Sequence, residues 1–225
     1  MSKGQKIGAE VAMSAGEMAL PSADALAASP GAETGLIELC RRGDGQAFAR
    51  LVALHERMVF NLALRLLGDP EEAKDLSQDV FLQVYRMLGR FEGRSSLKTW
   101  IYRIVVNQCR NRQRWWRRRK RDRTSPLETL TAVDEAKLSD AERHDGPYEH
   151  MRRTEQARRV QEALAGLSFE HRAILLLREV ECLSCEDVAT TLGLPEGTVK
   201  SRLARAREAL RRRLLPMLGE RELGS

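Results

Sequence analysis

The chain has 225 residues and a mass of 25.5 kDa, which is room for one large domain or two small ones. Its 38 Lys and Arg residues exceed its 32 Asp and Glu residues, and 42% of the residues are hydrophobic, which excludes collagen-like, mucin-like and wholly disordered chains. No stretch approaches the ~18 uninterrupted apolar residues of a membrane span, and four cysteines are too few to staple a secreted mini-domain. We therefore expect a soluble protein in a reducing compartment.

The first 32 residues differ in composition from the rest of the chain. They contain nine Ala, four Gly, four Ser and two Pro residues and show no sustained period. We predict a disordered extension over 1–33, because such a stretch cannot bury enough apolar surface to fold. Two early lysines ahead of small apolar residues faintly resemble a secretion signal, but three acidic residues interrupt the apolar segment that such a signal needs.

From Thr34 onward, apolar residues recur every three or four positions, which is the spacing that lines one face of a helix. Gly43-Asp44-Gly45 predicts a break between a short helix and a long one. At 68–72, a Gly, an N-cap Asp, a Pro and two Glu residues predict that one helix ends and another begins. This third helix is predicted to end near Gly89. It would bury Ala73, Leu76, Val80, Val84 and Leu88 and point Glu72, Asp75, Gln78, Asp79 and Gln83 outward.

A loop over 90–96 precedes a fourth predicted helix, which Ser96 or Thr99 can cap. Between 100 and 125 ten bases and one acid give a local charge of +9, whereas between 128 and 157 eight acids and four bases give −4. The second stretch is poor in apolar residues and has no clear period, so we interpret it as an interdomain linker. The predicted inward residues of the fourth helix are Trp100, Ile101, Ile104, Val105 and Cys109.

Helical spacing returns at about Glu155, and four more helices fit before the end of the chain. No period-2 run of β-branched residues occurs anywhere. We therefore predict an all-α protein with two small helical domains, over 34–116 and 155–218, joined by a flexible linker over 117–154 and followed by a tail over 219–225. The predicted core of the second domain is Val160, Ala163, Leu164, Leu167, Ala173, Ile174, Leu177, Val188, Ala189, Leu192, Val199, Leu203, Ala206, Leu210 and Leu214.

The segment 184–207 has the spacing of a helix-turn-helix. This motif needs a small residue where its helices approach, a Gly four residues later for a turn with positive φ, and a branched apolar residue six further on. Ala189, Gly193 and Val199 occupy these positions. Between 196 and 213 seven bases face two acids, which favours a DNA-recognition helix over an ordinary solvated hairpin. The predicted DNA-binding residues are Thr198, Lys200, Ser201, Arg202 and Arg205, with Arg207 as a further candidate.

The basic helix at 99–121 is a second candidate for nucleic-acid contact, with a merely solvated basic tail as the alternative. Phe91, Trp100 and Tyr102 provide ring faces that can stack on unpaired bases, and the amide of Asn107 can read base edges. For Trp100, the alternative is an anchor in the core.

No motif suggests an enzyme or a cofactor site. Cys182 and Cys185 form a C-x-x-C, but there is no second pair and the nearest histidine, His171, lies eleven residues earlier, so zinc would lack ligands. No histidine has a catalytic spacing, and no Gly-rich phosphate loop follows a strand. We expect no catalytic residue, no metal ligand, no cofactor and no small-molecule substrate. A third hypothesis is a redox or zinc sensor at Cys182 and Cys185, which would add to another function and not replace it.

Several segments together resemble the bacterial RNA polymerase sigma factors of the extracytoplasmic-function (ECF) group of the sigma-70 family. The likeness covers about residues 35–116 and 155–215. It lies in RRGDGQAF (41–48), LRLLGDPEEAKDLSQDVF (64–81), FEGRSSLKTWIYRI (91–104) and the helix-turn-helix. This chain differs from the family at Cys185, where a bulkier residue is usual, at Asp79, where Glu is commoner, and in its front extension.

The resemblance implies a transcription initiation factor that binds core RNA polymerase and promoter DNA. The helix over 70–88 would dock on the polymerase, through Asp75, Gln78, Asp79 and Gln83. The loop over 91–98 would capture a flipped base of the −10 element, the next helix would read neighbouring bases, and the helix-turn-helix would read the −35 element. The linker over 117–154 would thread toward the active-site and RNA-exit channel. The residues implied in −10 recognition and melting are Phe91, Ser95, Ser96, Trp100, Arg103, Asn107, Arg110 and Asn111.

The resemblance also implies a cytoplasmic protein of the stress response, held by an anti-sigma factor that is membrane-bound or soluble. Melting would proceed without ATP, because the sequence has no nucleotide-binding motif. The alternative is a free-standing transcriptional regulator, which would bind DNA tightly as a dimer without polymerase. In that case the acidic helix over 70–88 would be a protein interface of another kind.

Overall fold

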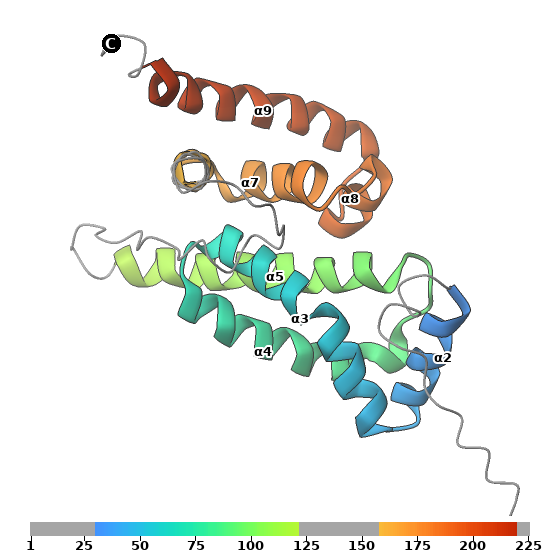
Figure 1. The fold of residues 1–225 in the computed structure, drawn as a ribbon. Coiled ribbons are helices and arrows are strands. Elements are labelled where there is room, and N and C mark those ends of the chain that lie inside the picture. Colours follow the sequence, from blue (N-terminus) through green and yellow to red (C-terminus); the bar gives the residue numbers. More distant parts are fainter. Residues whose placement is uncertain (1–29, 122–157, 220–225) are drawn as a thin grey trace, which may run out of the picture. The chain divides into compact units, whose positions relative to one another are not determined.

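The structure, a computed structural model, describes residues 30–121 and 158–219, and in these ranges every regular element is a helix (Figure 1). This confirms the all-α prediction. Most of the predicted extension over 1–33, linker over 117–154 and tail over 219–225 lies outside the described residues. No helix within the described ranges is long and apolar enough to cross a membrane. The chain forms two compact units, Met1–Phe48 and Ala49–Ser225.

The first unit contains α2 (Pro30–Arg41) and the first residues of α3 (Gly45–Leu67). Gly43 has a φ of +84°, which a glycine adopts readily, and the chain turns there as predicted. The Asp44 carboxylate then accepts hydrogen bonds from the backbone N–H groups of Gln46 (2.8 Å) and Ala47 (3.1 Å), so it caps α3. The helical spacing was predicted to begin at Thr34, but α2 begins four residues earlier, at Pro30.

The second unit begins with the rest of α3, followed by α4 (Pro70–Met87), the 3₁₀ turn η1 (Leu88–Arg90) and α5 (Leu97–Arg121). The Asp69 carboxylate accepts hydrogen bonds from the N–H groups of Glu71 (2.9 Å) and Glu72 (3.1 Å), which confirms the predicted start of α4. Ser96 caps α5, because its Oγ accepts a hydrogen bond from the Thr99 N–H (3.0 Å). α5 continues five residues beyond residue 116, where the first domain was predicted to end.

The predicted inward positions of α4 and α5 are buried, with one exception. Ala73, Leu76, Val80, Val84 and Leu88 are all buried, as are Ile101, Ile104, Val105 and Cys109, whereas Trp100 is half-buried. Burying side chains of this size contributes roughly 1.5–3 kcal/mol each, relative to exposure. The apolar stripes therefore hold α4 and α5 together, and their remaining faces are available for polar contacts.

The C-terminal part of this unit contains a helix over 158–165, α7 (Phe169–Leu175), the π-helical segment η3 (Leu176–Val180), α8 (Cys185–Leu192) and α9 (Glu196–Gly219). Four helices were predicted here, and residues 158–219 contain four, with η3 as the continuation of α7. Most of the predicted core residues are buried or half-buried, but the prediction for Val160 is wrong, since this side chain is 40% exposed. Val160 lies in the first described turn of its helix, ahead of the packed Ala163 and Leu164, so the apolar stripe runs beyond the packed part.

Arg172 on α7 is a buried cation that sequence periodicity does not reveal. Its side chain is 7% exposed and donates hydrogen bonds to the carbonyl oxygens of Ala165 (2.7 Å), Leu167 (3.3 Å) and Leu66 (2.8 Å). Burial lowers the pKa of Arg172, and the nearby Arg117 charge lowers it further. The last carbonyls of a helix have no partner within it, so one guanidinium here satisfies the ends of α3 and of the helix over 158–165.

We expect His55 to make the stability of the protein depend on pH. Burial lowers the pKa of His55 to about 4, and the charge of Lys98 acts in the same direction. Between pH 6.5 and 4 the unfolded chain therefore binds more protons at this residue than the folded chain does. The free energy of unfolding should fall with decreasing pH across this window, by up to about 1.4 kcal/mol per pH unit from this residue.

Urea unfolding at pH 7.0, 6.0 and 5.0 measures this dependence, with His55→Gln as the matched variant. The variant should lose less stability than the wild type over this range, because glutamine does not titrate. Equal losses in the two proteins would show that His55 is not protected from protonation by the fold.

Candidate nucleic-acid interface

The turn between α8 and α9 has the geometry that its sequence spacing predicts. Gly193 lies in the left-handed region, with φ 65° and ψ 42°, and its N–H donates to the carbonyl oxygen of Ala189. The N–H of Leu194 donates to the same oxygen (3.0 Å). Val199 is fully buried, so it anchors the start of α9. The pair of helices is a helix-turn-helix, and the first turns of α9 follow directly from its turn.

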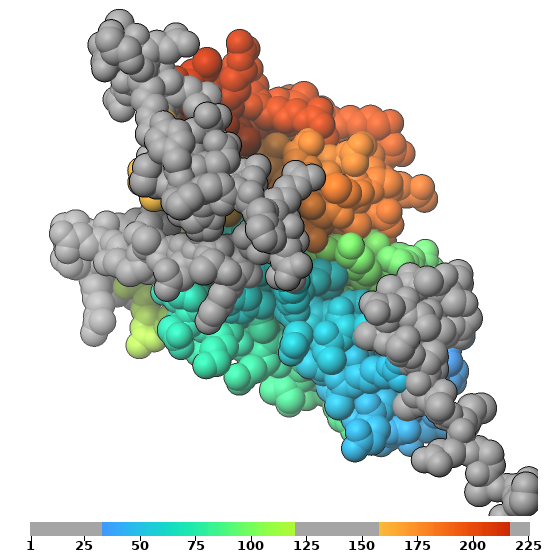
Figure 2. All heavy atoms as spheres, in the orientation of Figure 1, coloured from blue at the N-terminus to red at the C-terminus, as the bar shows by residue number. Residues whose placement is uncertain are grey.

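The first turns of α9 present polar side chains to solvent. Lys200, Ser201 and Arg205 are exposed, and Thr198 and Arg202 are partly exposed. Lys200 Nζ lies 2.7 Å from Glu196 Oε1, and this hydrogen bond raises the pKa of Lys200. All five candidate residues for the −35 element therefore lie on accessible parts of one helix, whose surface Figure 2 shows in orange to red.

Arg207, the further candidate on α9, is engaged within the protein. Its guanidinium nitrogens donate to Glu179 Oε1 at 2.9 and 2.6 Å. Both side chains are about half-exposed, so this is a surface ion pair, of the kind that contributes about 0–1 kcal/mol to stability.

α5 carries the candidate base-reading residues for the −10 element. Arg103 and Asn107 are exposed one turn apart, and Asn111 is exposed one turn further along. Arg110 is half-buried: its guanidinium carbon lies 5.7 Å from the centroid of the Phe169 ring, and its Nη1 lies 3.4 Å from Asn107 Oδ1. Arg103, Asn107 and Asn111 are therefore more accessible than Arg110.

The three aromatic residues predicted to offer ring faces for stacking differ in exposure, and Phe91 and Tyr102 lack an accessible face. Phe91 is 8% exposed and Tyr102 is fully buried, whereas Trp100 is half-buried. The Phe91 and Trp100 ring centroids lie 5.3 Å apart. The Tyr102 hydroxyl donates to the Glu181 carboxylate, and burial and this hydrogen bond raise the pKa of Tyr102. Sequence periodicity predicted one buried face for α5, but this helix packs on more than one side.

The loop before α5 is shaped by its own polar side chains. Gly93 has a φ of +71°, and Arg94 pairs with Glu92. The Ser96 Oγ lies 2.8 Å from the Thr99 Oγ1 in addition to capping the helix, and the Ser95 Oγ lies 3.4 Å from the carbonyl oxygen of Ser96. Ser95 and Ser96 retain partial exposure, so the loop presents hydroxyl and backbone groups beside Trp100.

The outward face of α4 is partly as predicted. Asp75, Gln78 and Asp79 are exposed. Glu72 and Gln83, also predicted to point outward, are partly buried against α5: Glu72 Oε2 lies 3.2 Å from Arg112 Nη1, and Gln83 Oε1 accepts a hydrogen bond from Gln108 (2.5 Å).

Two large apolar side chains on α4 were missed by sequence reasoning. Leu82 is 54% exposed and Tyr85 is 56% exposed. The sequence did contain a signal for them, because Phe81-Leu82 and Val84-Tyr85 are pairs of adjacent apolar residues. Neighbouring residues point to different sides of a helix, so a narrow buried face can take only one residue of each pair. Exposed apolar residues next to carboxylates are typical of a surface that binds another protein.

The four cysteines carry free thiols. Burial raises the pKa of Cys109 to about 12, and burial also raises the pKa of Cys40, which disfavours the reactive thiolate form at both positions. Cys182 is exposed, with φ 56°, and Cys185 is partly exposed at the start of α8. Within the described ranges, no three His, Cys, Asp or Glu residues gather as metal ligands would.

Comparison with known proteins identifies both halves of the chain. Residues 51–123 match the family model "Sigma-70 region 2", and residues 157–210 match "Sigma-70, region 4". RNA polymerase sigma-H factor of Pseudomonas aeruginosa is 38% identical over 191 residues, which cover 82% of this chain and 95% of the relative. ECF RNA polymerase sigma-E factor of Haemophilus influenzae is 33% identical over 187 residues, with coverages of 81% and 95%.

A solved structure resembles the chain as well. The sigma factor RpoE of Bartonella quintana, in complex with the anti-sigma factor NepR, has a TM-score of 0.60 and 26% sequence identity. The match covers 74% of this chain and 96% of the solved chain.

Proposed function

The chain belongs to the extracytoplasmic-function group of the sigma-70 family, whose members direct RNA polymerase to promoters, and we propose how its helices divide this task. Residues 34–116 form the domain that docks on core polymerase and melts the −10 element. Residues 155–218 form the domain that reads the −35 element. The linker over 117–154 connects them, and the segments over 1–33 and 219–225 flank them.

The −35 element is read by the start of α9. The exposure of Lys200, Ser201 and Arg205, directly after the Gly193 turn, supports this role. Side chains in the first turns of a recognition helix contact base edges in the major groove, while Lys and Arg also hold phosphates. Thr198 and Arg202 lie next to these residues on α9 and are the remaining residues proposed to contact the −35 element.

The −10 element is read by α5 and the loop before it. The observation that carries this proposal is that Arg103 and Asn107 are exposed on a helix whose adjacent positions, Tyr102 and Val106, are fully buried. Arg donates to guanine and Asn bonds adenine in the major groove, and both also contact unpaired bases. Arg110 and Asn111 extend this surface along the helix.

The flipped base is captured beside Trp100. This ring is half-buried against Phe91, so it is held in place while part of it stays accessible. The Ser95 and Ser96 hydroxyl groups lie in the same loop and can bond a base edge or a phosphate. Trapping an unstacked base in this way favours the melted state, because the contacts form only once the base has left the duplex.

Core polymerase is bound by α4. Asp75, Gln78 and Asp79 give its outward face a polar and acidic character, and Leu82 and Tyr85 add exposed apolar surface to it. An acidic patch selects a basic partner and raises the association rate, and the apolar side chains supply binding energy. Gln83 lies at the edge of this surface.

The two DNA-reading surfaces act together. Each is weak alone, but core polymerase holds them at a fixed separation, so binding of one raises the effective concentration of the other. Polymerase also supplies most of the phosphate attraction that all promoters share. The free protein is expected to bind promoter DNA poorly. It works in the cytoplasm, where polymerase and the chromosome are.

An anti-sigma factor regulates the protein. The Bartonella quintana relative is solved in complex with one, NepR, and an acidic-apolar face such as that of α4 is a surface that such a partner can cover. A regulator that covers α4 blocks polymerase docking without touching DNA.

The proposed function is tested by transcription with purified core polymerase, with and without this protein. Promoter-specific transcripts that require the protein support it. Tight binding of the protein alone to duplex DNA, without association with core polymerase, would indicate a free-standing regulator instead.

A further inference from the structure

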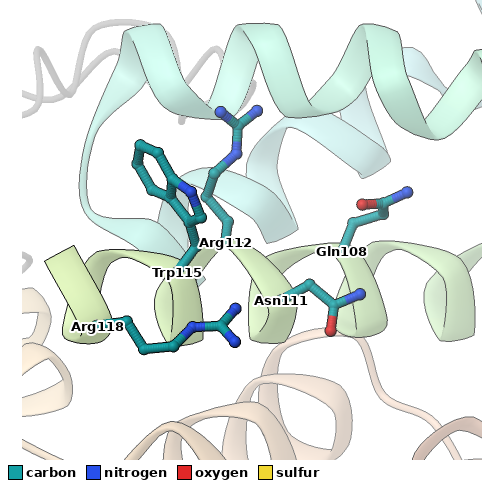
Figure 3. Close-up of a pocket in the computed structure, with 5 residues that line it drawn as sticks. All are labelled: Gln108, Asn111, Arg112, Trp115 and Arg118. Atoms are coloured by element: carbon teal, nitrogen blue, oxygen red, sulfur yellow. The ribbon is translucent and has the colours of Figure 1, made fainter.

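α9 begins with an acidic residue, although this helix is proposed to bind a polyanion. Glu196 is the first residue of α9 and the only acid among residues 196–207. α5, the other helix proposed to read DNA, contains no acid between Leu97 and Arg121. A carboxylate is repelled by phosphates, so its presence on α9 requires an explanation of its own. For comparison, Figure 3 shows a shallow cavity on α5 that is lined by cations, amides and an indole, those of Gln108, Asn111, Arg112, Trp115 and Arg118.

Glu196 lies on the face of α9 that carries a proposed DNA contact. Lys200 follows it by four residues, and residues four apart share one face of a helix. Lys200 Nζ lies 2.7 Å from Glu196 Oε1, and the side chains are 64% and 50% exposed. A carboxylate has two oxygens with about four acceptor positions, so this ion pair leaves acceptor capacity for a ligand. The carboxylate is therefore accessible, and Lys200 offsets part of its repulsion by phosphates.

The residue after Glu196 is a glycine that the packing of the protein does not require. Gly197 has no positive φ, and a Cβ at this position would have no side chain of the described residues within 4 Å. A glycine also lowers helix stability relative to alanine. An exposed glycine without either constraint fits the close approach of another molecule, because the missing side chain leaves the surface beside Glu196 open.

The base that fits an accessible carboxylate is cytosine. In the major groove cytosine presents its N4 amino group as a donor, whereas guanine presents the acceptors N7 and O6, and thymine presents the acceptor O4. An ionised carboxylate can only accept hydrogen bonds. Adenine has an amino donor, but its N7 acceptor lies beside this donor and repels a carboxylate. Glu196 would therefore favour cytosine and reject guanine and thymine, so that repulsion contributes to the specificity.

We propose that Glu196 is a specificity-determining residue, which accepts a hydrogen bond from the N4 amino group of one cytosine in the −35 element, and that Gly197 leaves space for this base pair. The proposal rests on the proposed function of α9, since it requires the first turns of this helix to lie in the major groove. The same carboxylate weakens the attraction of α9 to DNA of any sequence, because its charge opposes phosphate binding.

The experiment measures the base preference of the reconstituted holoenzyme at each position of a randomised −35 element. At one position the wild type should prefer cytosine over guanine and thymine by roughly 10-fold. With Glu196→Gln the preferred base at this position should change to adenine, because an amide accepts from adenine N6 and donates to adenine N7. With Glu196→Ala the preference at this position should be lost, while the preferences at the other positions remain.

The matched control is Glu208→Gln, which removes the same charge from an exposed position further along α9, where Glu208 pairs with Arg212 (3.1 Å). This variant should select the same −35 sequence as the wild type. Gly197→Ala gives a second measurement. It should raise the urea concentration at which the protein unfolds, because alanine favours the helix, and it should weaken promoter binding, because its methyl group occupies the open space.

Identical base preferences in the wild type, Glu196→Gln and Glu196→Ala would overturn the proposal. A gain of affinity for all sequences in these variants, without a change of preference, would also contradict it, since Glu196 would then act only through its charge. Normal promoter binding by Gly197→Ala would refute the part assigned to Gly197. If the wild-type holoenzyme selects no −35 element at all, the proposed function itself fails, so the two failures are distinguishable.

Discussion

Replacing both Arg103 and Asn107 with alanine is expected to lower promoter-specific transcription by roughly 30-fold or more. Both side chains are exposed, on a helix that is otherwise fixed by buried Ile101, Tyr102 and Val106. A well-formed contact to a base contributes about 1–3 kcal/mol to discrimination, and two such contacts together correspond to roughly 30-fold to 10⁴-fold. The substitutions remove no buried group, so the fold and the docking of polymerase should be unchanged.

The measurement is in-vitro transcription from a fixed promoter at equal concentrations of holoenzyme. A matched control is Arg42→Ala/Gln46→Ala, which removes one exposed arginine from the turn after α2 and one exposed amide from α3. The control should transcribe like the wild type. Normal transcription by the Arg103/Asn107 variant would contradict the assignment of −10 reading to α5.

Reversing the charge of the α4 face should greatly weaken the binding of core polymerase. In the variant Asp75→Lys/Gln78→Lys, two exposed side chains next to Leu82 become cations and meet a partner that is expected to be basic. Central contacts of a protein interface commonly contribute 2–4 kcal/mol each, so affinity should fall at least about 100-fold. Neither residue contacts Arg112, so the α4–α5 packing should be retained.

Surface-immobilised core polymerase and a titration of each variant measure this affinity. Glu56→Lys, an exposed charge reversal on α3, is the control and should bind normally. Asp79→Lys gives a second comparison. It should weaken polymerase binding and also lower the free energy of unfolding by about 0.5–1 kcal/mol, because Arg112 loses a partner. Full binding by the Asp75/Gln78 variant would contradict the assignment of α4 as the docking helix.

The sequence was sufficient to predict features governed by local chemistry. Asp69 and Pro70 specify the start of α4 through a side-chain cap and a fixed φ, and Gly193 specifies the turn before α9 through a positive φ. These effects depend on a few adjacent residues. The all-α fold class was also predictable, because the spacing of apolar residues along each segment is a local property of the sequence.

Features that depend on neighbouring helices were not predictable. Periodicity placed Glu72 and Gln83 on the outer face of α4, but Arg112 and Gln108 of α5 reach them. Likewise Tyr102 was predicted to offer a ring face for stacking on bases, yet its side chain is fully buried. The distance and angle between two helices decide which polar side chains meet, and no single helix encodes them.

The most direct test of the central claim is in-vitro transcription by core RNA polymerase on a library in which both promoter elements and the spacer length are randomised. With this protein present, we predict transcripts that share one two-element motif at a narrow spacing, and none of them without it. A selected motif confined to one element, or transcripts that do not depend on the protein, would contradict the proposal that α5 and α9 read two elements together in one holoenzyme.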